Sequence, residues 1–187
     1  MGGGAKVSAS SIWLAVSWWG IVIEISRITT VYDEVEDRVS LTGQGPADEI
    51  YRGWLTRRLF DILLERLFEI LGAADADGYS SVINEFAQNS AEADLKPSPP
   101  VTLGAGDQEI GPFLITEIDI ADLDGTIKLG FRHNAEEGAS LALAHRDLRK
   151  WLAIVRNAYT KAGWPMRNWP DWMTDRPSAS AERPVLH

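Results

Sequence analysis

The sequence predicts an α+β fold of two tandem duplicated, strand-rich units, each with about three antiparallel strands followed by one helix. Two observations support this: short apolar runs with strand periodicity come before each of two long amphipathic segments, and residues of one half reappear in the same order in the other. The matched positions are Ile28 and Thr29 with Ile115 and Thr116, 39–41 with 127–129, and Leu59 and Leu63 with Leu148 and Leu152. We therefore expect the two units to be related by a pseudo-twofold axis.

The chain divides into five segments on this basis. They are a leader at 1–19, a first unit at 20–72, a connector at 73–109, a second unit at 110–163, and a Trp- and Pro-rich tail at 164–187 whose end we expect to be disordered. The connector is predicted to contain a short helix from Ser80 to Ala93. Its length suits a crossing between two halves of one body.

The first unit begins with Ile21, Ile23 and Ile25 on alternate positions, which predicts a strand within 20–32. Further strands are predicted at Arg38 to Thr42 and Glu49 to Trp54, and Thr56 is a suitable N-cap for a helix that reaches Leu71. The apolar residues of that helix cover more than the usual arc of about 100°. We expect it to be covered on two sides.

The second unit shows the same order of elements. Its predicted elements are a strand from Phe113 to Ile120, a hairpin turn at Asp124 and Gly125, a strand with Ile127, Leu129 and Phe131 on one face, a third strand around Leu141 and Leu143, and a helix from about Arg146 to Ala162. Gly163 and Pro165 end that helix.

Composition restricts the classes of function. The formal charge of −9 opposes nonspecific attraction to nucleic acid or anionic lipid. The chain has no cysteine, which excludes disulfides and thiolate sites and is compatible with the cytoplasmic localisation that we predict. The apolar run from Ile12 to Ile23 is shorter than the roughly 20 residues needed to cross a bilayer, so it is interpreted as a first strand or buried leader.

No catalytic, cofactor or metal site is predicted. The acidic turns around Asp122 and Asp124 lack the outer ligands of a calcium loop, and a hairpin turn explains them better. The three histidines, His133, His145 and His187, show no metal-ligand spacing, and we expect His145 to cap the second helix or lie at the surface. The prediction is therefore of a protein that is not an enzyme, with a site between the two halves as a minority alternative.

Lys128 and Arg132 alternate with the buried residues of their strand, so both should project from the outer face of its sheet. Cations near aromatic residues suit single-stranded nucleic acid. The predicted order of elements resembles the arrangement in Whirly and PUR-type single-stranded nucleic-acid-binding proteins, although the resemblance assigns no role to a residue of this chain. It keeps nucleic-acid binding through Lys128 and Arg132 as an alternative function.

The leading functional hypothesis is a non-enzymatic interaction or accessory protein. Its partner would be another protein, bound through an exposed helix face, a sheet edge or the tail. Trp169 and Trp172 are the candidate contacts in the tail, because tryptophan is enriched among binding hot spots and the neighbouring prolines prevent a helix there. The wide apolar surface of the first helix leaves a homodimer open.

Overall fold

The computed structural model of the chain describes residues 21–72, 80–105, 107–134 and 137–174. The elements in chain order are β1 (Ile21–Ile25), β2 (Arg27–Asp33), β3 (Arg38–Gln44), β4 (Glu49–Leu55), α1 (Arg57–Gly72), α2 (Ser80–Ala93), β5 (Gln108–Leu114), β6 (Glu117–Leu123), β7 (Thr126–Arg132), β8 (Glu137–Ala144) and α3 (His145–Ala162). The α+β class predicted from the sequence is confirmed.

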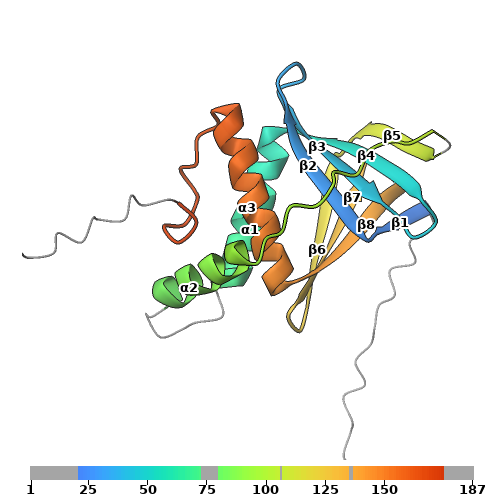
Figure 1. The fold of residues 1–187 in the computed structure, drawn as a ribbon. Helices are drawn as coiled ribbons and strands as arrows, with labels where there is room; N and C mark the ends of the chain where they lie inside the picture. Colours follow the sequence, from blue (N-terminus) through green and yellow to red (C-terminus); the bar gives the residue numbers. More distant parts are fainter. Residues whose placement is uncertain (1–20, 73–79, 106, 135–136, 175–187) are drawn as a thin grey trace, which may run out of the picture.

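The strands form two sheets of four. Sheet A has the order β1-β8-β7-β6, and sheet B has the order β2-β3-β4-β5. In Figure 1 the strands lie together and the three helices gather on one side of them. Each sheet therefore takes three consecutive strands from one half of the chain and its fourth strand from the other half.

Three consecutive antiparallel strands come before a helix in each half, β2–β4 before α1 and β6–β8 before α3, which fits the prediction loosely. The structure differs from the prediction in two respects. Within the described ranges each half contributes four strands, and β1 and β5 pair in parallel with β8 and β4 of the opposite half. The predicted strand within 20–32 is split at Ser26, whose backbone N–H and hydroxyl both donate to the carbonyl of Gln44 where the chain passes from sheet A to sheet B. In the second half, β5 begins at Gln108, inside the predicted connector.

The main core lies between the inner faces of the two sheets. Val39, Leu41 and Leu55 of sheet B and Ile127 and Leu129 of sheet A are all fully buried. This burial follows from strand alternation, because residues two apart share one face.

Two glycines let neighbouring side chains approach sheet B closely. A Cβ atom at Gly43 would lie 2.4 Å from Cδ1 of Ile25, and one at Gly53 would lie 2.6 Å from Cδ1 of Ile115. Ile25 is the last residue of β1 and Ile115 lies in the link between β5 and β6, so both are next to a point where the chain leaves one sheet for the other. Larger residues at Gly43 and Gly53 would displace the side chains of Ile25 and Ile115 from sheet B.

Helices α1 and α3 close the core at one end. Phe60 of α1 contacts the rings of both Trp151 and Tyr159 of α3, at centroid distances of 6.1 and 5.7 Å. The predicted cap at Thr56 is present, since its Oγ1 accepts from the N–H of Leu59 at 3.3 Å. The broad apolar surface of α1 is thereby covered by the sheets and by a second helix.

Of the run from Ile12 to Ile23, only 21–23 fall within the described residues, where they belong to β1. Among the described helices, none combines the length and the apolar character that a membrane crossing requires.

Candidate functional site

Helix α2 has an unusual distribution of polar and apolar residues. Its side chains that face the body include Asn84 and Gln88, which are 4% and 1% exposed. Its outward side chains include Val82, Ile83 and Phe86, which are 67%, 52% and 76% exposed. This is the reverse of an ordinary surface helix, whose apolar stripe faces the core.

The inward face of α2 is held by a polar network with α3. Arg149 of α3 is buried and donates to the side-chain oxygen of Asn84 at 2.5 Å, while Gln88 donates to the backbone carbonyl of Arg149 at 3.0 Å. Farther along, Arg156 pairs with Glu92 at 2.9 Å. Directional bonds of this kind fix which face of α2 turns inward, because buried polar groups require partners.

The guanidinium of Arg149 is closed off from solvent on its other side by the tail. Its Cζ lies 5.1 Å from the ring centroid of Trp172, a cation–π contact. Burial lowers the pKa of Arg149 because it penalises the charged form. Arg149 thus holds both α2 and the tail residue Trp172 against α3.

The two tryptophans predicted to meet a partner lie in different surroundings. Trp169 is buried against Phe68 and Tyr159, with centroid distances of 5.2 and 5.3 Å. Trp172 is partly buried and contacts the ring of Phe68 at 5.9 Å. Trp169 thus offers little surface to a partner, whereas Trp172 retains an accessible part.

Lys128 and Arg132 lie on the outer face of sheet A, as alternation in β7 requires. Arg132 pairs with Glu117 at 2.5 Å and with Asp119 at 3.0 Å, both on the neighbouring strand β6. Glu24 of β1 shares this face through its register with Ser140 of β8. Three carboxylates therefore accompany the two cations, and the face is not basic overall.

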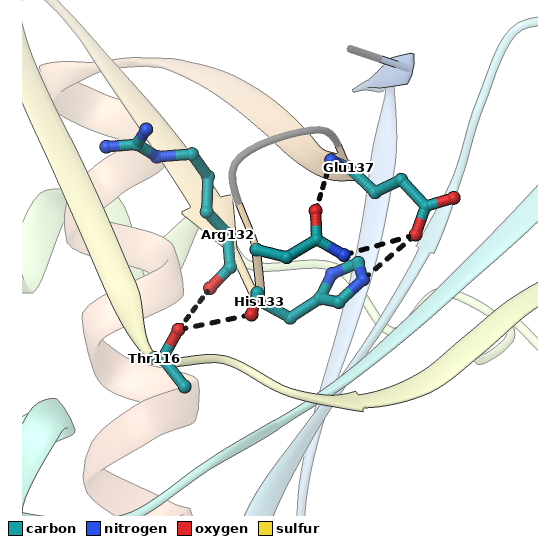
Figure 2. Close-up of polar contacts among 5 residues, drawn as sticks. Thr116, Arg132, His133 and Glu137 are labelled. Carbon is teal, nitrogen blue, oxygen red and sulfur yellow. Dashed lines mark hydrogen bonds and ion pairs between the residues drawn. The ribbon is translucent and has the colours of Figure 1, made fainter.

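A third cluster joins the sheets at the end of β7. The ring of His133 stacks on Phe113 of β5, with centroids 3.7 Å apart and planes at 3°. Its Nε2 lies 3.1 Å from one carboxylate oxygen of Glu137, a contact drawn in Figure 2. The side-chain amide of Asn134 donates to the same oxygen at 3.4 Å. The hydroxyl of Thr116 donates toward the backbone carbonyls of Arg132 and His133 in the same view.

This cluster ties a turn of sheet A to an edge strand of sheet B. The side chain of His133 is 10% exposed, so a substrate would have little access to its ring. In the described part of the chain its Nδ1 is buried without a hydrogen-bond partner. The geometry supports a packing role, and within those residues no group of His, Cys, Asp and Glu is arranged to hold a metal ion.

His145 is the first residue of α3, but it does not cap the helix. The N-cap position is Ala144, and no side chain bonds to the first turn there. The backbone N–H of His145 instead donates to the carbonyl of Gly125 at 3.1 Å. His187 lies outside the described residues.

Comparison of the chain with protein-family models, curated proteins and solved structures finds no match.

The apolar outer face of α2 is the feature that sequence reasoning missed. The helix from Ser80 to Ala93 is predictable, and its apolar residues Val82, Ile83 and Phe86 fall on one side at helical spacing. Ordinary reasoning assigns that side to the core. The burial of Asn84 and Gln88 shows that it faces solvent.

Proposed function

We propose that the protein is a non-enzymatic interaction or accessory protein that binds another protein through the outer face of α2. The observation that carries this proposal is the exposure of Val82, Ile83 and Phe86 on a helix whose polar residues face inward. Exposed clusters of large apolar side chains mark interaction sites in folded proteins. An amphipathic helix that lays such a face into a groove is a recurring mode of protein recognition.

A protein partner explains this face better than a membrane surface. Helices that lie on membranes carry Lys and Arg on their polar side. Helix α2 contains no basic residue and carries Glu85 and Glu92, in a chain of formal charge −9. Such a helix would be repelled by anionic lipid.

The tail contributes to the same surface in this proposal. Trp172 packs over Arg149, which also holds Asn84 of α2. A partner that docks on α2 could therefore reach the accessible part of Trp172. Trp169, also in the tail, packs against Phe68 and Tyr159 and so holds the tail on the body.

We also propose that the two halves arose by duplication, with a pseudo-twofold relation between them. Exchanging the halves converts the strand order of sheet A into that of sheet B, with β1 corresponding to β5 and β8 to β4. Among the described residues helix α2 has no counterpart in this scheme, since it lies in the connector. An added helix with an exposed apolar face is a natural place for a function specific to this chain.

The alternative of single-stranded nucleic-acid binding through Lys128 and Arg132 is less favoured. Arg132 is neutralised by Glu117 and Asp119, and a phosphate backbone would meet their carboxylates. If nucleic acid nevertheless binds at low salt and the Lys128→Glu, Arg132→Glu double variant abolishes it, this alternative replaces the helix proposal.

The test compares three forms of the full chain: wild type, Phe86→Ser and Val35→Ser. Val35 is 93% exposed on the β2–β3 turn, so its variant loses an exposed apolar side chain elsewhere. Each form is used to capture partners from the native host, and the captured protein is then purified and its affinity for each form is measured. We expect Phe86→Ser to weaken binding at least about tenfold, as for an interface anchor, while Val35→Ser binds normally.

Two outcomes would overturn the proposal. If the affinity is equal for all three forms, α2 is not the binding face. If light scattering shows that the wild type is a dimer and Phe86→Ser a monomer, the face is occupied by a second copy of the chain.

A further inference from the structure

The outer face of sheet A is hollowed at its centre. Gly130, Gly138, Ser140 and Ala121, contributed by three neighbouring strands, are small and leave a hollow of about 380 Å³. This size falls within the range of about 300 to 1,000 Å³ that is usual for small-molecule sites. The hollow lies on a different face from the α2 surface and does not depend on it.

Ser140 provides a polar group inside this hollow. Its register opposite Gly130 of β7 and Glu24 of β1 places it on the outer face, yet it is only 6% exposed. In the part of the chain that the structure describes, its hydroxyl makes no hydrogen bond. The hydroxyl is therefore a polar group that a ligand in the hollow can hydrogen-bond to.

Charge indicates which kind of ligand fits. Two cations line the hollow, but Arg132 is already compensated by Glu117 and Asp119. Lys128 is exposed and has no ion pair among the described residues. The hollow therefore offers one cation that is available to an anionic group, and Glu24, on the same face, lies two strands away from Lys128 on β1.

The rest of the lining favours a flat apolar body. Val22 and Ala121 supply apolar side chains, and the glycines allow a planar group to approach the backbone of β7 and β8. Gly138 cannot be enlarged without disturbing the sheet, because a Cβ atom there would lie 2.6 Å from the carbonyl oxygen of Phe131. The close packing of β7 and β8 thus keeps this part of the hollow free of side chains.

We propose that this hollow is a binding site for a small, flat organic anion. Lys128 pairs with the anionic group, Ser140 hydrogen-bonds to the ligand, and the planar body lies over Gly130 beside Ala121 and Val22. A nucleic-acid strand is a poorer occupant, because the phosphates beyond the hollow would meet Glu117 and Asp119.

The test uses 8-anilinonaphthalene-1-sulfonate, a fluorescent aromatic sulfonate, titrated into the folded full-length protein. We expect one bound probe per chain. Lys128→Glu should weaken its affinity about tenfold or more, because the charge-assisted contact is replaced by repulsion. Ala121→Phe, which fills the hollow, should abolish binding, and Ser140→Ala should give a smaller loss.

Two matched controls separate this site from other surfaces. Lys96→Glu makes the same charge change at an exposed position after α2, and Phe86→Ser removes the apolar face that could bind the probe independently. Both should keep the wild-type affinity. The proposal is overturned if wild type does not bind the probe, if Lys128→Glu binds as tightly as wild type, or if Phe86→Ser alone abolishes binding. Lys128 is on the surface, so its variant should fold even if Ala121→Phe does not.

Discussion

Helices α1 and α2 follow one another in the chain but are attached to the body by different forces. Helix α1 buries six large apolar side chains, Phe60, Leu63, Leu64, Leu67, Phe68 and Leu71. Helix α2 buries amides against a guanidinium and exposes its large apolar residues. The first is held by the hydrophobic effect and belongs to the core. The second is held by directional bonds, which leave its apolar face available to a partner.

The largest expected effect comes from truncating a buried apolar side chain of α1. Leu67 is fully buried, so Leu67→Ala should lower the free energy of unfolding by about 2–5 kcal/mol through lost burial and a residual cavity. Urea unfolding followed by circular dichroism measures this change. The control, Ile62→Ala, alters a side chain that is 56% exposed and should cost far less. Equal losses for both variants would mean that α1 is not anchored in the way described.

The next effect tests the polar attachment of α2. Asn84→Leu removes the side-chain oxygen that accepts from Arg149 and should destabilise the protein by about 1.5–3 kcal/mol, since the guanidinium stays buried without that partner. Hydrogen exchange of the α2 amides should accelerate more than that of α1.

A double variant sharpens this test. In Asn84→Leu with Arg149→Met, both polar partners are replaced by apolar side chains of similar size, which is often nearly neutral. It should therefore be more stable than Asn84→Leu alone. A double variant that is the less stable of the two would contradict the network as the source of the effect.

Alkaline pH should weaken the α1–α3 contact. Tyr159 of α3 donates to Asp61 of α1 at 2.8 Å, and burial followed by this hydrogen bond raises the pKa of Tyr159. Burial also raises the pKa of Tyr51 to about 12. A tyrosine in the unfolded chain ionises near pH 10, about the usual value. The stability that depends on the neutral hydroxyls is therefore present below pH 10 and is lost as the pH rises above it.

The expected loss is about 1 kcal/mol for each of these tyrosines by pH 11. Urea unfolding at pH 8 and pH 11 measures it. Tyr159→Phe should be less stable than wild type at pH 8, where it lacks the bond to Asp61, but should lose less on going to pH 11. Asn84→Leu should keep the wild-type pH dependence, because the hydrogen bonds described between α2 and α3 involve no tyrosine. A pH dependence unchanged by Tyr159→Phe would exclude Tyr159 as its source.

The smallest effect is expected at the outer face of α2. Phe86→Ser should change the free energy of unfolding by no more than about 0.5 kcal/mol, because the ring is 76% exposed. Thermal unfolding of this variant beside wild type measures the difference. A large loss would show that Phe86 supports the fold, and the contrast between the two helices would then disappear.

Much of the local structure is predictable from these residues. Alternation at Ile127, Leu129 and Phe131 defines β7, and Thr56 marks the start of α1 through its capping hydroxyl. The outward direction of Lys128 and Arg132 follows from the same alternation. Their electrostatic surroundings do not, because Glu117 and Asp119 belong to a different strand and only the β6–β7 register brings them to Arg132.

The sequence by itself determined most of the elements, since their periodicity and caps depend on residues within one or two turns of each other. It did not show the break at Ser26 or the start of β5 at Gln108, which depend on pairing with strands of the other half. The tertiary structure decided which strands pair across the two halves, because the parallel contacts of β1 with β8 and of β4 with β5 join segments far apart in the chain. It also decided which face of α2 is buried. A helical pattern shows that a helix has two faces, but only the position of Arg149 on the neighbouring helix made the polar face the inner one.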